Sequence, residues 1–202
     1  MRIGLFGGSF DPPHEGHLQP VEAARSALGL DRVLFLPTAV PPHKDGPRHA
    51  PALARYAMVE LALLEREGLF ASTFELVPER PAYTIDTVDH FLATEPEADF
   101  VLLIGGDSFA SFHTWRRWRE IAGRVPLAVL ARPGWEEQRM LEAAEPEVRA
   151  LAENGRATLV RGPHLPYSST EIRTALAAGH EPPEGALPEL VIGYIRKYSL
   201  YR

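Results

Sequence analysis

The chain has 202 residues, of which 45% are hydrophobic and 24% charged, with a formal net charge of −6 and no cysteine. These values predict a globular protein with a substantial core, and they exclude disulfides, thiolate metal sites and cysteine nucleophiles. The acidic balance argues against a protein that coats nucleic acid. Since no apolar stretch reaches the length of a membrane span or of a signal peptide, we expect a cytoplasmic protein with no membrane or nucleic-acid partner.

Short apolar runs alternate with helical patterns along the chain. Strands are predicted at Arg2–Phe6, Arg32–Leu36, Ser72–Leu76, Phe100–Ile104, Leu127–Ala131 and Ala157–Val160. Helices are predicted at Glu15–Leu28, Ala50–Glu67, Ile85–Ala93, Trp115–Ile121, Glu136–Glu153, Ser169–Ala178 and Pro188–Tyr198. This alternation predicts an α/β fold of βαβ units, with a Rossmann-like, mainly parallel sheet and helices on both faces. We expect one domain over residues 1–202, with 180–202 as a C-terminal helical appendage.

Five polar clusters fall after predicted strands or at helix starts that follow them. If the strands are parallel, their carboxyl ends share one edge of the sheet, which is where ligands bind in open α/β sheets. The first cluster is a turn of Gly7, Gly8 and Ser9, followed by His14 and His17 on one face of a helix start. Glycines let the backbone N–H groups approach a phosphate, and two imidazoles can stabilise its charge.

The alternative for this first cluster is a glycine turn with surface histidines, which the spacing of the two histidines argues against. The glycines fit neither the dinucleotide fingerprint nor the P-loop. The second cluster holds Lys44 in the Pro-rich segment Pro37–Pro51, expected to be a long loop. Lys44 suits a polyphosphate, but a lone lysine is equally typical of a solvated surface.

The third and fourth clusters each have a simple structural explanation. Thr84 suits a helix N-cap with Asp86 in the first turn, and capping alone would explain it. Asp107 suits a ribose, a metal or a cap, whereas Trp115 suits stacking on a heterocycle or packing in the core. In the fifth cluster, Ser168 and Glu171 predict a capping box at a helix start.

The helix start of the fifth cluster also suits an anion, because it carries hydroxyls and cations. These residues are Ser168, Ser169, Thr170 and Arg173, with Arg132 adding a cation at the same sheet edge.

Taken together, these motifs resemble the bacterial nicotinate mononucleotide adenylyltransferases of the nucleotidylyltransferase superfamily. The resemblance runs over nearly the whole chain. Its motifs are Gly7–Pro12, His14–His17, Pro42–Lys44, Tyr83–Thr87, Gly106–Ser108 with Trp115, and Ser168–Arg173. The resemblance implies that ATP and nicotinate mononucleotide react to give deamido-NAD and pyrophosphate, with Mg²⁺ arriving on the triphosphate.

The resemblance also implies residue roles. The catalytic set is His17, His14 and Lys44. The implied ATP-binding set is Gly7, Gly8, Ser9, Phe10, Asp107, Arg132, Ser168, Ser169, Thr170 and Arg173. The implied mononucleotide-binding set is Tyr83, Thr84, Trp115 and Arg116, and no resident metal site is implied. Arg116 departs from the family, which has an aromatic residue there, so selectivity for the carboxylate over the amide stays open.

Two rival functions remain open from the sequence. One is the same reaction on another acceptor, such as nicotinamide mononucleotide or phosphopantetheine. The other is a catalytically silent nucleotide-binding regulator, which would have little use for cations around a reacting phosphate. The oligomeric state is also open. The last predicted helix is expected to pack on the core, and a contact between copies of the chain is the alternative.

Overall fold

The computed structural model describes residues 1–39, 49–77, 83–131, 137–163 and 165–202. The chain divides into two compact units. Unit 1 comprises Met1–Gly7, Gln19–Leu34 and Tyr83–His164. Unit 2 comprises Gly8–Leu18, Phe35–Ala82 and Leu165–Arg202.

A six-stranded sheet has the strand order β3-β2-β1-β4-β5-β6. Its strands are β1 (Arg2–Gly8), β2 (Arg32–Pro37), β3 (Leu69–Ala71), β4 (Asp99–Gly105), β5 (Leu127–Leu130) and β6 (Ala157–Val160). The pairs β1–β4, β4–β5 and β5–β6 are parallel, with Ile3 opposite Phe100 and Leu102 opposite Leu127. Apolar runs form these strands because both faces are covered, and the residues of β5 are all buried.

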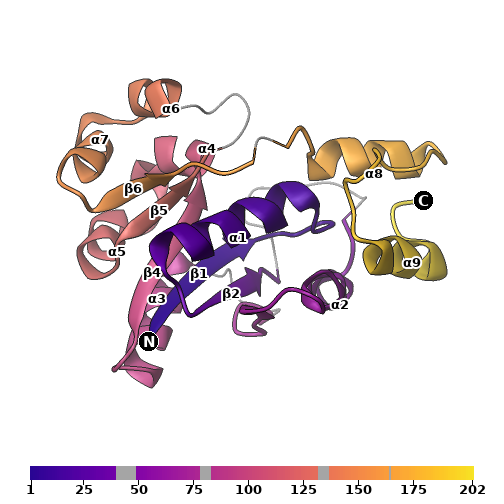
Figure 1. The fold of residues 1–202 in the computed structure, drawn as a ribbon, viewed down its shortest axis with the longest axis horizontal. Coiled ribbons are helices and arrows are strands. Elements are labelled where there is room, and N and C mark those ends of the chain that lie inside the picture. The colour runs from indigo at the N-terminus through magenta and orange to yellow at the C-terminus, as the bar shows by residue number, and fades with distance from the viewer. Residues whose placement is uncertain (40–48, 78–82, 132–136, 164) are drawn as a thin grey trace. The chain divides into compact units, whose positions relative to one another are not determined.

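Unit 1 holds most of the helices that follow or precede these parallel strands. They are α1 (Glu15–Leu28), α3 (Thr84–Thr94), α4 (Gly106–Ala110), the 3₁₀ helix η1 (Phe112–Thr114), α5 (Trp118–Arg124), α6 (Glu137–Ala143) and α7 (Pro146–Glu153). The first residues of α1 belong to unit 2. The chain moves from β1 to β2 in one direction along the sheet and from β4 to β5 in the other (Figure 1). Since such crossovers are right-handed, α1 and α5 cover opposite faces, as the sequence predicted.

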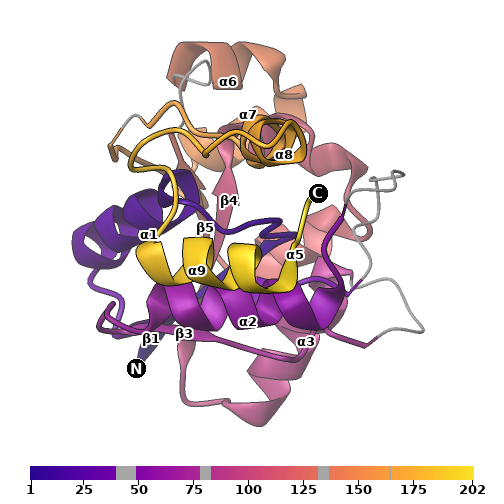
Figure 2. The same ribbon diagram turned by 90° about the vertical axis from the view of Figure 1, so that its right-hand side faces the viewer.

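Unit 2 is built around a pair of adjacent helices. Its helices are α2 (Ala52–Leu63), α8 (Ser169–Ala177) and α9 (Glu189–Tyr198), and α9 lies alongside α2 (Figure 2). The backbone N–H of Glu15, at the start of α1, donates to the carbonyl of Ala186, just before α9, at 2.9 Å. This bond fastens the segment before α9 to the first turn of α1.

The predicted strand at Ser72–Leu76 is wrong, because the third strand is Leu69–Ala71. Gly68 has a positive φ of 77°, which turns the chain and starts the strand directly after it. Within the predicted range, the N–H of Leu76 instead donates to the carbonyl of Thr73, which forms a turn.

The predicted helix at Glu136–Glu153 is also wrong, since α6 ends at Ala143 and α7 begins at Pro146. A proline in the middle would remove one hydrogen bond and clash with the preceding turn, whereas proline at the first helical position is favourable. The helix predicted at Trp115–Ile121 begins instead at Trp118, because Arg117 adopts the left-handed conformation with φ 56°. The predicted helix at Ala50–Glu67 is shorter at both ends and spans Ala52–Leu63.

Candidate functional site

The first part of the candidate site is the turn that follows β1, which from Gly8 onward belongs to unit 2. A Cβ added to Gly8 would come within 2.9 Å of the Phe10 ring, so no side chain fits there. Phe10 itself adopts a left-handed φ of 45° and is buried, with its ring centroid 5.4 Å from that of Phe35. The core therefore holds the side chain of Phe10, so that only its backbone is suited to meet a ligand.

His14 and His17 come together at the start of α1, as their spacing predicted. Their ring centroids lie 3.8 Å apart, with His14 buried and His17 half-buried. The backbone N–H of His14 donates to Nδ1 of His17 at 3.4 Å, a long hydrogen bond. Because that nitrogen accepts, the neutral His17 ring carries its proton on Nε2, where it can donate to an anion.

The first turn of α8 is hydrogen-bonded to the same turn after β1. Arg173 donates from Nη1 to the carbonyl of Asp11 at 2.7 Å, and Ser169 donates from Oγ to the carbonyl of Pro12 at 3.1 Å. Ser168 caps the helix, accepting from the N–H of Glu171 at 3.2 Å. The residues expected to hold the triphosphate thus lie beside the histidine-bearing turn within unit 2.

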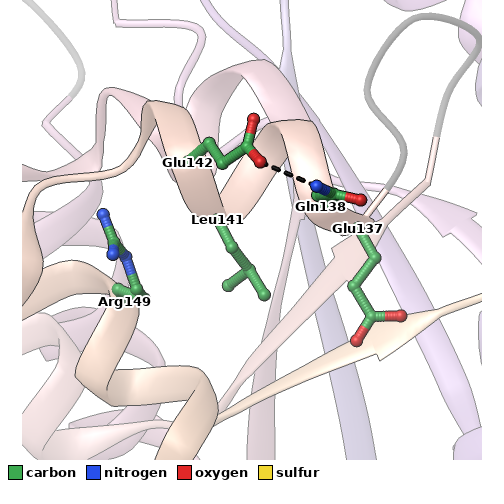
Figure 3. A pocket seen from close by; sticks show the side chains of 5 residues that line it. All are labelled: Glu137, Gln138, Leu141, Glu142 and Arg149. Atoms are coloured by element: carbon green, nitrogen blue, oxygen red, sulfur yellow. Dashed lines mark hydrogen bonds between the residues drawn. The ribbon is translucent and has the colours of Figure 1, made fainter.

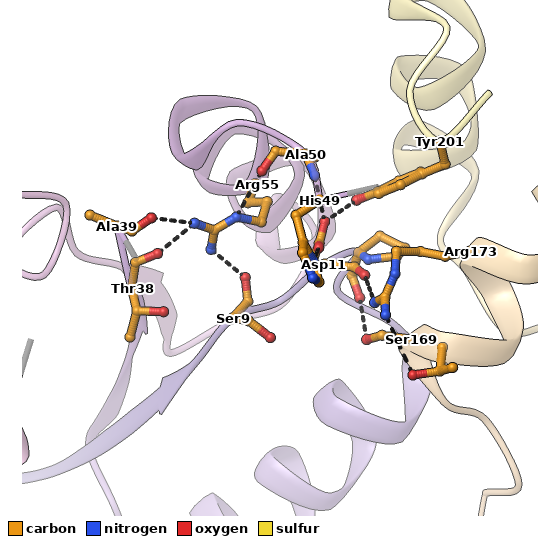
Figure 4. Close-up of polar contacts among 12 residues, drawn as sticks. Ser9, Asp11, Thr38, Ala39, His49, Ala50, Arg55, Ser169, Arg173 and Tyr201 are labelled. Atoms are coloured by element: carbon orange, nitrogen blue, oxygen red, sulfur yellow. Dashed lines mark hydrogen bonds and ion pairs between the residues drawn. The ribbon is translucent and has the colours of Figure 1, made fainter. Parts of the chain in front are cut away.

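Behind this turn lies a polar network that sequence reasoning missed (Figure 4). It joins the buried carboxylate of Asp11 to His49 and Tyr201, and the buried guanidinium of Arg55 to the carbonyl of Ser9. The sequence could have indicated a buried role for Arg55, because this charged residue shares the apolar face of its helix with Met58, Val59 and Ala62. Tyr201 gave no signal in the sequence.

Unit 1 carries the residues expected to bind the mononucleotide. Tyr83, and not Thr84, is the N-cap of α3, because the N–H groups of Asp86 and Thr87 both donate to the Tyr83 carbonyl. Capping therefore does not explain Thr84. The guanidinium carbon of Arg116 lies 4.6 Å from the centre of the Tyr83 ring, a cation–π contact that joins two of the predicted residues.

Asp107 and Trp115 both follow β4 in unit 1. Asp107 is exposed in the first turn of α4, where Gly105 is the N-cap, so it does not cap that helix. Trp115 is half-buried, with its ring centroid 5.2 Å from that of Phe112, whereas Trp118 is 8% exposed and packs in the core. The tryptophan that packs in the core is therefore Trp118 and not Trp115.

Three further positions complete the predicted set. Gly7 lies within β1, where a Cβ would meet nothing within 4 Å. Lys44 and Arg132 lie outside the described residues.

Among the described residues, no three His, Asp or Glu side chains gather so that they could hold a metal ion. None of the described helices is long and apolar enough to cross a membrane.

A hollow of about 370 Å³ on unit 1 lies apart from all these residues. It is lined by Glu137, Gln138, Leu141, Glu142 and Arg149 of α6 and α7 (Figure 3). None of the residues predicted for nucleotide binding lines it, so the hollow is not counted in the candidate site.

Comparison with known proteins identifies the group to which these features point. The cytidylyltransferase-like family matches residues 5–175. A relative from Solibacter usitatus, named as a probable nicotinate-nucleotide adenylyltransferase, is 40% identical over 100% of both chains. A relative from Bordetella petrii with the same name is 42% identical over 100% of this chain and 99% of its own.

Solved structures agree on the fold. The nicotinic acid mononucleotide adenylyltransferase of Plasmodium falciparum, complexed with NaAD, superposes with a TM-score of 0.79 at 20% identity. The match covers 99% of this chain and 97% of that one. A putative nicotinate-nucleotide adenylyltransferase of Vibrio parahaemolyticus gives a TM-score of 0.67 at 21% identity, covering 100% of this chain and 95% of that one.

Proposed function

Because the chain belongs to the cytidylyltransferase-like family, among its nicotinate-nucleotide adenylyltransferases, we propose that it transfers the adenylyl group of ATP to nicotinate mononucleotide. The products are deamido-NAD and pyrophosphate, in the synthesis of NAD. The structural observation that carries this proposal is the pair of hydrogen bonds from Arg173 and Ser169 to the turn before His14 and His17. That contact gathers a helix start, a guanidinium and two imidazoles at one turn, a combination suited to a triphosphate.

In the proposed reaction, a phosphate oxygen of nicotinate mononucleotide attacks the α-phosphorus of ATP in line with the leaving group. One P–O bond forms, the bond from the α-phosphorus to the bridging oxygen breaks, and its electrons leave with pyrophosphate. A phosphate monoester is already an anion at neutral pH, so the attack needs no general base. Catalysis then consists of positioning and charge stabilisation.

His17 has the central role in this proposal, donating from Nε2 to an α-phosphate oxygen as charge develops there. His14 packs against it and fixes its orientation. The backbone of Gly7–Phe10 and the side chain of Lys44 also meet the phosphates. Ser168, Ser169, Thr170 and Arg173 meet the β- and γ-phosphates, with Arg132 as a further cation.

Mg²⁺ enters this proposal as part of the substrate, MgATP. Phosphate oxygens are hard donors that suit Mg²⁺, which keeps several waters when it binds to nucleotides. The carboxylate of Asp107 is exposed and acidic, and it suits a ribose hydroxyl of ATP, which can donate to it.

The acceptor half of the proposal rests on unit 1. Trp115 is half-exposed and offers a ring face to the pyridine, and the start of α3 at Thr84 offers N–H groups to its carboxylate. Arg116, held over Tyr83, supplies a positive charge in the same cluster. A positive charge favours a carboxylate over a neutral amide, so the acid is the proposed substrate.

Pyrophosphate release from MgATP tests the proposal when each candidate acceptor is assayed in parallel. Nicotinate mononucleotide is expected to give the highest kcat/KM, and nicotinamide mononucleotide and phosphopantetheine lower values. A higher kcat/KM with either rival would reassign the acceptor. Binding of ATP without pyrophosphate release from any acceptor would favour a nucleotide-binding regulator instead.

A further inference from the structure

The carboxylate of Asp11 is the centre of the network behind the nucleotide-binding turn, and it is fully buried. It receives three donors, all from unit 2. The Tyr201 hydroxyl donates to Oδ1 at 2.6 Å, the N–H of Ala50 donates to Oδ1 at 3.1 Å, and Nδ1 of His49 pairs with Oδ2. A buried carboxylate with several donors is held firmly in one orientation, because the loss of a donor leaves its buried charge less well compensated.

The carbonyl of the same residue carries a second kind of contact. Arg173 donates to the Asp11 carbonyl, and Ser169 donates to the carbonyl of the next residue, Pro12. The carboxylate of Asp11 therefore faces the network, while the adjacent backbone carbonyls of Asp11 and Pro12 accept from two residues proposed to bind the triphosphate. A rotation of Asp11 would displace both of those residues together.

Arg55 ties the rest of the turn to the same network. Its Nη1 donates to the carbonyl of Ser9 at 2.5 Å and its Nη2 to that of Thr38 at 2.5 Å, while Nε donates to that of Ala50 at 3.1 Å. The side chain is 1% exposed. Burial lowers the pKa of the Arg55 guanidinium, and the charge of Asp11 opposes that shift.

Tyr201 reaches Asp11 only because the chain reverses after α9. Ser199 and Tyr201 both adopt left-handed conformations, with φ of 51° and 67°. L-residues rarely adopt this backbone, so packing elsewhere must hold it, and the Tyr201 side chain is the group that is buried. Burial, together with the neighbouring Asp11, raises the pKa of the Tyr201 hydroxyl, which therefore remains a donor at neutral pH.

We propose that Tyr201 is a positioning residue for ATP, whose hydroxyl holds Asp11 and thereby the turn Ser9–Pro12 in the conformation that receives the triphosphate. This inference rests on the proposed function only in taking the turn as the ATP site. It assigns a role in nucleotide binding to a side chain distant in sequence from every motif described above. The nicotinate half of the site has no part in it.

The substitution Tyr201→Phe removes the hydroxyl and keeps the ring that fills the core. Its matched control is Tyr198→Phe, the same change on α9 at a side chain that is 55% exposed. Calorimetric titration with the non-reacting analogue α,β-methylene-ATP and Mg²⁺ should show affinity reduced about five- to tenfold in Tyr201→Phe, the scale of one net intramolecular hydrogen bond. Affinity for nicotinate mononucleotide, titrated separately, should stay within twofold of the parent protein, and Tyr198→Phe should match the parent in both.

A double-mutant cycle with Asp11→Asn tests whether Tyr201 acts through Asp11. If it does, Tyr201→Phe weakens analogue binding far less in the Asp11→Asn background than in the parent. Equal and additive effects would overturn the proposal, as would unchanged analogue binding in Tyr201→Phe or an equal loss of affinity for both ligands. If Asp11→Asn fails to fold, the affinities of Tyr201→Phe for the analogue and for nicotinate mononucleotide, compared with those of the parent, still decide whether the proposal holds.

Analogue binding also separates this inference from the proposed function. A parent protein that binds the analogue but releases no pyrophosphate with any acceptor would refute the transfer reaction and leave the Tyr201 comparison valid. A parent protein that binds no analogue would refute the ATP site, and the positioning role with it.

Discussion

Gly8 and Phe10 show how closely single residues set the shape of the turn that is proposed to bind the nucleotide. The Phe10 ring occupies the space in which a side chain at position 8 would lie, and Phe10 itself holds a left-handed backbone. A left-handed backbone is strained for a residue other than glycine. At Phe10 the strain persists because the ring is anchored in the core against Phe35. The turn is thus preorganised before any ligand arrives, which is what positional catalysis requires.

At this scale, the first prediction concerns His17. The substitution His17→Ala should lower kcat by roughly 10²–10³, the usual effect of removing one donor to the developing charge, with a smaller effect on the KM for ATP. Steady-state pyrophosphate release measures both constants. The control His180→Ala, at an exposed position after α8, should behave as the parent. A His17→Ala enzyme with near-normal kcat would remove this residue from the mechanism.

A second prediction concerns Trp115. Aromatic stacking on a heterocycle contributes about 1–3 kcal/mol, so Trp115→Ala should raise the KM for nicotinate mononucleotide by about tenfold or more. Trp115→Phe keeps a ring face and should fall between the two. The KM for ATP should not change. If only the KM for ATP changed, the assignment of Trp115 to the pyridine ring of nicotinate mononucleotide would be wrong.

The residues of the candidate site were predictable where the chemistry lies in a local motif. The spacing of His14 and His17 places their rings together, and Ser168 caps α8 as its pairing with Glu171 suggested. The contact of Asp11 with Tyr201 was not predictable, because it joins residues 190 positions apart and depends on a chain reversal after α9. Only tertiary packing brings such side chains together.

At the scale of the elements, α2 combines core packing with a polar function. Met58 and Val59 fill the core on one side of the helix, and Arg55, one turn earlier, reaches back to bind backbone carbonyls. Arg55 donates to carbonyls on both sides of residues 40–48, those of Ala39 and Ala50. A single helix thereby holds the backbone at both Ala39 and Ala50.

The third prediction follows from this arrangement. Arg55→Met keeps most of the side-chain volume but removes every donor to these buried carbonyls, so it should lower the free energy of unfolding by roughly 3–5 kcal/mol. Urea denaturation measures this loss. The control Arg161→Met, at a side chain that is 88% exposed, should keep the parent's midpoint. A small loss in Arg55→Met would mean that water replaces the guanidinium without penalty.

The boundaries of an element were predictable where a clear sequence pattern, such as a helical repeat of apolar residues, marked them. Helix α1 occupies Glu15–Leu28 as predicted, because its apolar positions Leu18, Val21 and Ala24 repeat with helical spacing and are buried. Pro146 is a local signal for a helix start, so the sequence contains the reason why the single helix predicted at Glu136–Glu153 is wrong. In contrast, the left-handed Arg117 that delays α5 has no signal, because arginine has no preference for that conformation.

At the scale of the whole molecule, the two halves of the proposed reaction fall largely on different compact units. The turn from Gly8, both histidines and the start of α8 belong to unit 2, whereas Tyr83 and Trp115 belong to unit 1, together with Asp107 from the ATP half. The parallel alternation of strands and helices was predictable from periodicity. The division into two units was not, since each unit gathers three separate stretches of chain.

The fourth prediction uses the stability of the whole chain as the readout. A ligand that binds only the folded state at 100 times its Kd stabilises that state by about 2.7 kcal/mol. For a chain of this size, such a gain raises the melting temperature by roughly 5–10 °C. Thermal unfolding with MgATP analogue alone, and with nicotinate mononucleotide alone, should each show an increase. A ligand that gives none at that ratio does not bind the folded protein as proposed.

The contrast between Trp115 and Trp118 also gives the molecule an optical property. The half-exposed indole of Trp115 emits at longer wavelength than the buried indole of Trp118, and an electron-poor pyridinium ring stacked on an indole quenches its fluorescence. In a Trp135→Phe variant, which keeps only these two indoles, titration with nicotinate mononucleotide should therefore dim the red side of the emission band and leave the blue side in place. The emission of that variant then reports occupancy of the proposed acceptor site without any label.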